Sequence, residues 1–220
     1  MVSDNKIVST NFQGGNIGIN PANATPSDSQ RDIIVERNMI VRGSVHMGGD
    51  SITVRNNIFY SDLASMFSAT GSNYGDIPGS LRPNNLYIYN NSIYTLVTAT
   101  SESILYNATS GINSATNVTL KNNVVYAPAS TTSVVIGGLG TPTITASNNT
   151  TNAQLKNTDP LFAVNPPVNP ADFKPTGASY AIGSNNACSG LPCATSSVPL
   201  WTDFFGATRT SSYDMGAVNK

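Results

Sequence analysis

The sequence predicts an all-β chain of stacked coils, and three observations support this fold class. One short pattern recurs six times, every copy keeps an asparagine at the same place, and no stretch sustains the apolar spacing of an amphipathic helix. The pattern reads apolar, any, apolar, any, a pair that ends in Asn, and then apolar residues. Its copies lie at Val2–Ile7, Ile33–Ile40, Ile52–Phe59, Leu86–Ile93, Val118–Val125 and Ile144–Thr151.

Each copy is interpreted as a strand, a corner and a second strand. The alternation before the Asn is typical of a strand with one buried face, and Asn tolerates the left-handed backbone that a sharp corner requires. The Asn residues lie 33, 19, 34, 32 and 26 positions apart, which indicates coils whose loops vary in length while the corner stays fixed. Stacked in register, their amides are expected to form an internal ladder.

Composition limits the partners and the location that are expected for the protein. Among its 220 residues 10% are charged and the formal net charge is -1, so no basic field is available for nucleic acid. There is no run of 18 apolar residues, so no membrane span is expected. A polar, low-charge chain with 27 asparagines favours a secreted or cell-surface protein. Cys188 and Cys193 frame a short segment that can close as a disulfide loop, and two unpaired thiols are the alternative.

The chain resembles the pectate-lyase-like superfamily of right-handed parallel β-helices, in which V-x-x-N-N-x-φ-Y is a frequent coil signature. Its C-terminal part also resembles the end of many secreted bacterial β-helix proteins, through Asp159–Phe162, Asp172–Pro175, Gly177–Ile182, Asp203–Gly206, Arg209 and Tyr213–Ala217. The resemblance implies about six coils over residues 1–157 and an irregular closing segment over 158–220. It is specific for the architecture and not for an activity.

One loop insertion and one strand edge are expected to depart from a simple stack of coils. A long insertion at 61–83 leaves the coils, and it is expected either to shape a binding groove or to be an ordered decoration. The coil pattern begins at Val2, although helices of this family usually carry a cap over the first coil. The first coil would then expose an unpaired strand edge, so we expect an N-terminal β-helix portion or a partner chain to cover it.

One column of outward-facing residues is a candidate site. The residues before each Asn pair are expected to stack about 4.8 Å apart, and they are Asp4, Glu36, Arg55, Tyr89, Lys121 and Ser147. In a functional interpretation, Arg55 or Lys121 acts as a base toward a uronate sugar, and an acidic residue holds substrate or calcium. Glu36 and Tyr89 would bind substrate and Asp4 would bind the metal. In the alternative interpretation, Glu36 and Arg55 form an ion pair across adjacent coils.

A second column consists of Val8, Val41, Tyr60, Tyr94, Tyr126 and Asn152. Its three successive tyrosines suit the faces of sugar rings, so they are candidate substrate-binding residues. Aromatic ladders also stabilise stacked coils without any ligand, and that structural role is the alternative.

The lone histidine, His46, lies near Asp50 and Arg55 in sequence, and these three are a candidate acid–base cluster, with Asp50 as a further candidate calcium ligand. The alternative is an ordinary surface histidine. Two functions follow from these patterns. One is a polysaccharide lyase that acts on uronate-containing glycan by β-elimination, and the other is a non-catalytic glycan-binding, adhesive or surface-structural β-helix.

Overall fold

Parallel strands form nearly all the regular structure of the protein. The computed structural model describes residues 1–8, 17–19, 31–43, 45–47, 51–61, 84–95, 102–107, 116–126, 128, 133–138, 144–147, 159–177, 179, 202–209 and 216–218. All the strand pairs in its sheets are parallel, so the predicted all-β, parallel and β-helix-like character is confirmed. The helix described is a 3-10 turn, Pro170–Phe173, and no helix in this part of the chain is long and apolar enough to cross a membrane.

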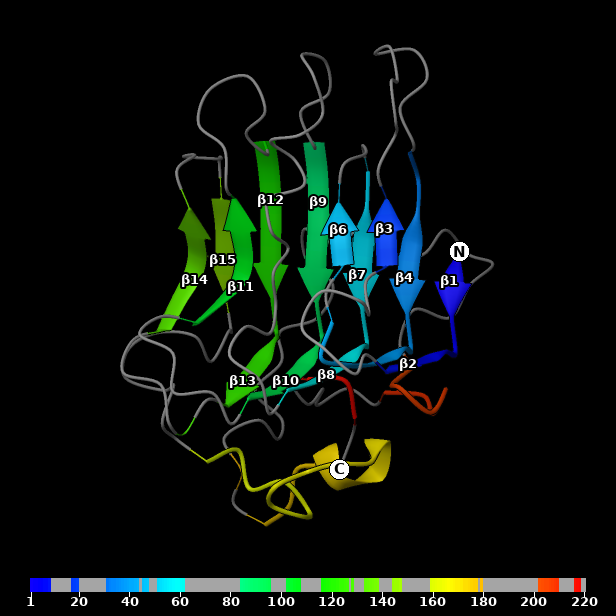
Figure 1. Cartoon of the computed structure of the whole chain (residues 1–220), viewed down its shortest axis with the longest axis vertical. Coiled ribbons are helices and arrows are strands. Elements are labelled where there is room, and N and C mark those ends of the chain that lie inside the picture. Colours follow the sequence, from blue (N-terminus) through cyan, green and yellow to red (C-terminus); the bar gives the residue numbers. More distant parts are fainter. Residues whose placement is uncertain are drawn as a thin grey trace.

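Two sheets run side by side along the stack (Figure 1). Sheet A has six strands, in the order β1 (Val2–Ser3), β4 (Ile34–Glu36), β7 (Thr53–Arg55), β9 (Asn84–Tyr89), β12 (Thr116–Lys121) and β15 (Ile144–Ser147). Sheet B has five, β2 (Lys6–Val8), β5 (Met39–Val41), β8 (Ile58–Ser61), β10 (Ser92–Thr95) and β13 (Val124–Tyr126). Two pairs complete the set, β3 (Ile17–Ile19) with β6 (Val45–Met47) and β11 (Glu102–Asn107) with β14 (Ser133–Gly138).

We call a sheet A strand, its corner and the following sheet B strand an arc. The corner residue of each arc has a left-handed backbone, and these residues are Asp4, Arg37, Asn56, Asn90 and Asn122, with φ between 52° and 61°. The recurrent Asn is therefore the residue after the left-handed position, and the expectation that it takes that conformation itself was wrong. The corner accepts Asp or Arg as well as Asn, because the recurrent Asn is required for a different reason.

That reason is a hydrogen-bonded ladder, which confirms the expected stacking of the amides. The backbone N–H and the side-chain amide of each Asn both donate to the Oδ1 atom of the Asn in the next arc, at 2.9 to 3.1 Å. The ladder runs through Asn5, Asn38, Asn57, Asn91 and Asn123. Each Nδ2 from Asn38 onward also donates to a carbonyl of the preceding arc, at Val2, Val35, Val54 and Ile88. The ladder thus joins every pair of neighbouring arcs.

The interior between the sheets is apolar. It contains Val35, Val54, Ile88 and Leu120 from sheet A and Ile40, Phe59, Ile93 and Val125 from sheet B, all buried. These residues occupy matching positions in successive strands, so alternate residues of each strand supply this core. Val2 and Ile7 in the first arc are only partly buried.

A second core lies on the other face of sheet B. Met39, Ile58 and Val124 pack there against Phe162, Phe173, Ala217 and Val218 of the C-terminal segment, residues 159–218. Figure 1 shows this segment, in yellow to red, running beneath the sheet B strands. The two phenylalanine rings, Phe162 and Phe173, have centroids 5.2 Å apart. Strands β5, β8, β10 and β13 of sheet B therefore contribute buried residues on both faces of the sheet, whereas Lys6 and Val8 of β2 are exposed.

The residues of the C-terminal signature hold this segment in place. Asp203 accepts hydrogen bonds from the N–H groups of Phe205 and Ala207, and Asp172 accepts from those of Val168 and Asn169. The buried Arg209 donates to the carbonyls of Gly216 and Ala217 and to Oδ1 of the corner residue Asn56, at 2.7 to 3.1 Å. Asp172 and Asp203 thus stabilise turns within the segment, and Arg209 joins the segment to the corner residue Asn56.

Removing one amide from the middle of the ladder should be far more damaging than removing the amide at its end. We expect Asn57→Ala to lower the free energy of unfolding by about 3 kcal/mol or more, because several buried groups lose their partners. The matched control is Asn5→Ala, at the exposed end, for which we expect about 1 kcal/mol. Urea unfolding followed by circular dichroism measures both, and equal losses would contradict the ladder.

Substitution of two glycines in the C-terminal segment distinguishes the cost of a steric clash from the cost of a left-handed backbone. Gly216 has φ 85°, and a Cβ there would lie 2.6 Å from Ser92 Oγ, whereas Gly206 has φ 80° and open space around it. We expect Gly206→Ala to cost about 1 kcal/mol from the left-handed backbone alone. Gly216→Ala should cost about 3 kcal/mol through added overpacking. Urea unfolding gives these costs, limited proteolysis reports release of the segment, and equal effects of the two variants would rule out the contact.

Candidate functional site

The charged column predicted on sheet A exists with one change of register. The structure pairs Glu36 with Arg55, Arg55 with Tyr89, Tyr89 with Lys121 and Lys121 with Ser147 in successive strands. In the first arc it pairs Ser3 with Glu36, so placing Asp4 in this column was wrong. Asp4 is the corner residue and is equivalent to Arg37. Ser3 lies two positions before Asn5, as Glu36 lies two positions before Asn38, so the spacing in the sequence itself agrees with this pairing.

The column was expected to be open to solvent, but its charged and aromatic side chains are buried. Glu36, Arg55, Tyr89 and Lys121 are only 2 to 7% exposed. Alternation along a strand shows which side of the sheet a residue faces, but it carries no information about what lies over that side. A polysaccharide cannot reach these four side chains in this conformation.

Two charges of the column, Glu36 and Arg55, bind each other. Arg55 donates to Glu36 Oε2 through Nε at 2.7 Å and forms an ion pair through its NH2 group at 2.6 Å, and its NH1 group donates to the Tyr89 hydroxyl at 3.2 Å. Arg37 binds Glu36 Oε1 at 2.7 Å and both carboxylate oxygens of Asp4 at 2.8 Å. The predicted ion pair across adjacent coils is confirmed, and it is buried.

This network defines what its members can do chemically. Two guanidinium groups, Arg37 and Arg55, face two carboxylates, Asp4 and Glu36, so the network has no excess charge. Burial raises the pKa of Tyr89, and the Arg55 cation partly opposes this, so the phenol keeps its proton at neutral pH. Arg55 is buried and bound to Glu36, so it cannot approach a sugar proton in this conformation, which argues against Arg55 as a general base.

The tyrosine column lies where the sequence predicted it. Val8, Val41, Tyr60, Tyr94 and Tyr126 pair in register through sheet B. Tyr60 and Tyr94 stack with ring centroids 6.1 Å apart, whereas Tyr126 meets Tyr94 edge-on at 5.5 Å.

The C-terminal segment covers most of these rings. Tyr94 and Tyr126 are buried in the second core, Tyr60 is half-buried, and the Tyr94 hydroxyl donates to Asn165 Oδ1 at 3.1 Å. Burial raises the pKa of Tyr94 and of Tyr126. An open platform of three flat rings, as the sugar-binding interpretation requires, is not present, and the ladder instead anchors the C-terminal segment.

The remaining predicted site residues are only partly within the described structure. His46 lies in β6, where its backbone pairs with Gly18, and the position of its side chain is outside the described residues. Asp50, Asn152, Cys188, Cys193 and residues 62–83 also lie outside them. No group of three His, Cys, Asp or Glu side chains that could hold a metal ion occurs in the part of the chain that the structure describes.

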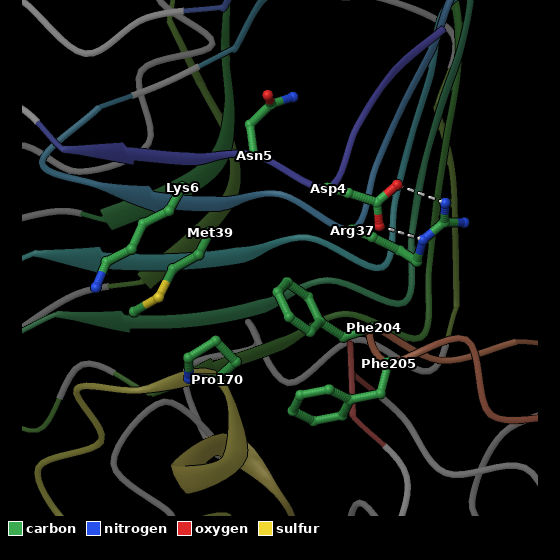
Figure 2. A pocket seen from close by; sticks show the side chains of 8 residues that line it. All are labelled: Asp4, Asn5, Lys6, Arg37, Met39, Pro170, Phe204 and Phe205. Atoms are coloured by element: carbon green, nitrogen blue, oxygen red, sulfur yellow. Dashed lines mark hydrogen bonds and ion pairs between the residues drawn. The ribbon is translucent and has the colours of Figure 1, made fainter.

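A cleft at the first arc was not predicted. It has a volume of about 340 Å³, and its lining comes from the first two arcs and from the C-terminal segment: Asp4, Asn5, Lys6, Arg37, Met39, Pro170, Phe204 and Phe205 (Figure 2). The Phe204 and Phe205 rings meet edge-on at 5.2 Å, and Phe205 is 56% exposed. Residues about 200 positions apart in the chain meet here, which no local pattern could reveal.

The cleft carries one cation in excess. Arg37 and Asp4 are bound to each other, as the dashed lines in Figure 2 show. The exposed Lys6 side chain forms no ion pair with any described residue, so its ammonium group is available to a ligand. The exposed Phe205 ring and the Lys6 ammonium line the same cleft, and the Lys6 side chain points away from the ring (Figure 2). A ring and a cation at different ends of one cleft can both contact a ligand long enough to span them, such as a carboxylated oligosaccharide.

Comparisons with known proteins identify no relative of this chain. A scan against protein-family models finds no match, and searches of curated proteins and of solved structures find none either. The site must therefore be interpreted from its own geometry.

Arg37 binds two carboxylates, the buried Glu36 and the exposed Asp4. Removing each charge in turn therefore gives a matched pair of variants. We expect Glu36→Gln to lower the free energy of unfolding by about 3–5 kcal/mol, because it leaves the buried Arg55 without a counter-ion. Asp4→Asn, which removes the exposed carboxylate, should cost less than about 1 kcal/mol because solvent screens the pair. Chemical denaturation at pH 7 measures both, and a Glu36→Gln loss below 1 kcal/mol would contradict a buried ion pair.

The Asp4 contribution should depend on pH. The hydrogen bond from Arg37 holds the pKa of Asp4 below its ordinary value of 3.8. The stabilisation is therefore complete well above pH 3.8 and disappears as the pH falls through the lower, folded-state value. The stability difference between the wild type and Asp4→Asn should vanish in that acid range, and a difference that grows on acidification would show the opposite shift.

Proposed function

We propose that this chain is an extracellular, non-catalytic β-helix that binds uronate-containing glycan. Its finer architecture in this proposal is a right-handed helix of about six coils closed by residues 158–220. The observation that carries the function is the cleft of the first arc, where the free ammonium of Lys6 and the exposed ring of Phe205 line one open space. The ring suits the apolar face of a sugar, and the ammonium suits its carboxylate.

The geometry favours binding over catalysis at the column first considered for chemistry. Arg55 is neutralised by Glu36, and both are buried. Lys121 is also buried, at 7% exposure, so neither predicted base reaches a polymer in solution. A lyase would need its base beside an open groove, and neither Arg55 nor Lys121 lines the open cleft of the first arc.

Affinity electrophoresis in gels that contain polygalacturonate, alginate or neutral dextran tests the proposal. We expect the two acidic polymers to retard the protein, dextran to have no effect, and the retardation to weaken at high salt because charge contributes to it. The same incubations, with and without calcium, are followed at the ultraviolet absorbance of unsaturated sugars. Absence of retardation by either acidic polymer would overturn glycan binding, and a rise in absorbance would restore the lyase hypothesis.

Variants of the cleft identify the residues that bind. Lys6→Gln and Phe205→Ala should each weaken retardation by about fivefold or more, since each removes one of the two contacts to the sugar. Lys174→Gln and Val164→Ala are matched controls, because both residues are exposed and neither lines the cleft. Equal effects of cleft and control variants would place the glycan elsewhere on the protein.

A further inference from the structure

Arg37 lines the cleft with a guanidinium group that is bound from two sides. Its NH1 group donates to Oε1 of Glu36 at 2.7 Å, and its Nε and NH2 groups donate to the two carboxylate oxygens of Asp4 at 2.8 Å. The Glu36 side chain is 5% exposed, whereas the Asp4 side chain is 59% exposed. One carboxylate therefore fixes the guanidinium from the buried side, and the other covers it on the exposed side.

The two carboxylates differ in how easily they are displaced. Breaking a buried ion pair leaves a charge without solvent, whereas an exposed pair competes with water and contributes little. Glu36 also binds Arg55, so it stays in place when Asp4 moves away. Arg37 then keeps its contact through NH1, and its Nε and NH2 donors can accept another carboxylate. These two donors form the planar fork that binds both oxygens of a carboxylate.

We infer that Arg37 is a second carboxylate-binding group of the cleft, and that Asp4 occupies it until a carboxylate of the ligand takes its place. For the identity of the ligand, this inference rests on the proposed glycan binding. Lys6 and the Arg37 guanidinium lie at opposite ends of the lining residues, and the Phe204 and Phe205 rings lie between them in the view of Figure 2. A ligand that contacts both cations needs two carboxylates on one chain. The ligand class is thus an oligouronate with neighbouring charged sugars, and not a glycan with isolated uronates.

Asp4→Asn removes the internal carboxylate and tests the inference. In isothermal titration calorimetry, we expect this variant to bind tetragalacturonate about three- to fivefold more tightly than the wild type, because no exposed ion pair has to be broken. Asp32→Asn is the matched control. Asp32 is exposed and does not line the cleft, and both Asp32 and Asp4 have a left-handed backbone that Asn tolerates, with φ of 55° and 61°. Equal gains would show a general effect of charge and overturn the inference.

A second substitution tests the role of the guanidinium fork. Arg37→Lys keeps the positive charge but lacks the two planar donors that bind both oxygens of a carboxylate. Combined with Asp4→Asn, it should abolish the gain in affinity for tetragalacturonate. Circular dichroism shows whether the double variant is folded at the temperature of the titration. A gain that persists in the folded double variant would overturn the assignment to Arg37.

Acetate, a carboxylate without a sugar, separates this inference from the proposed function. We expect acetate to shift the NMR resonance of the Arg37 Nε–H in Asp4→Asn at about three- to fivefold lower concentration than in the wild type, and chloride at equal ionic strength to have no effect. Absence of this shift overturns the inference.

The two titrations together show which proposal fails. If acetate shifts the resonance but tetragalacturonate binds neither protein, glycan binding is wrong and Arg37 remains a carboxylate site. If tetragalacturonate binds the wild type and Lys6→Gln weakens this binding, but Asp4→Asn does not strengthen it, the proposed function stands and the inference is overturned.

Discussion

The asparagine ladder is the constraint on which the rest of the structure depends. Asn38, Asn57 and Asn91 each join their own corner to both neighbouring arcs, so the positions of sheets A and B along the stack are fixed together. A slip of one residue would turn the apolar side chains of a strand away from the interior, and it would also leave several buried amide groups without partners. Loops between arcs can then vary widely in length, because register is determined at the corners and not by the connections.

The sequence revealed this constraint because it is local and repeated. The recurrent Asn, the alternation before it and the tyrosine column could all be found by aligning the chain with itself, and the structure has each of them. The same alignment excludes Asp4 from the charged column, because the residue two positions before the recurrent Asn is Ser3 in the first copy and Glu36 in the second, which is the pairing that the structure has. The left-handed residue was also misassigned, since Asn at both positions of the corner pair in three arcs hides which of the two has the positive φ.

What the sequence could not show is what covers each surface. The charged column and the tyrosine column both face away from the interior, and both were expected to be accessible, yet each is buried. For the tyrosines the cause is the C-terminal segment, whose Phe162 and Phe173 pack over sheet B. Two residues of the segment attach it directly to the arcs, because Arg209 donates to Asn56 Oδ1 and the Gly216 N–H donates to the Asn122 carbonyl.

The same closure explains why the accessible chemistry gathers at the first arc. Along sheet B the C-terminal segment lies against the strands, and its Ala217 N–H even donates to Ser92 Oγ. At the first arc the segment contributes Phe204 and Phe205 to an open cleft that Lys6 also lines. Lys6 and Val8 of the first arc are exposed, whereas Tyr94 and Tyr126 further along sheet B are buried. A ligand can therefore reach side chains at the first arc whose counterparts in later arcs are covered.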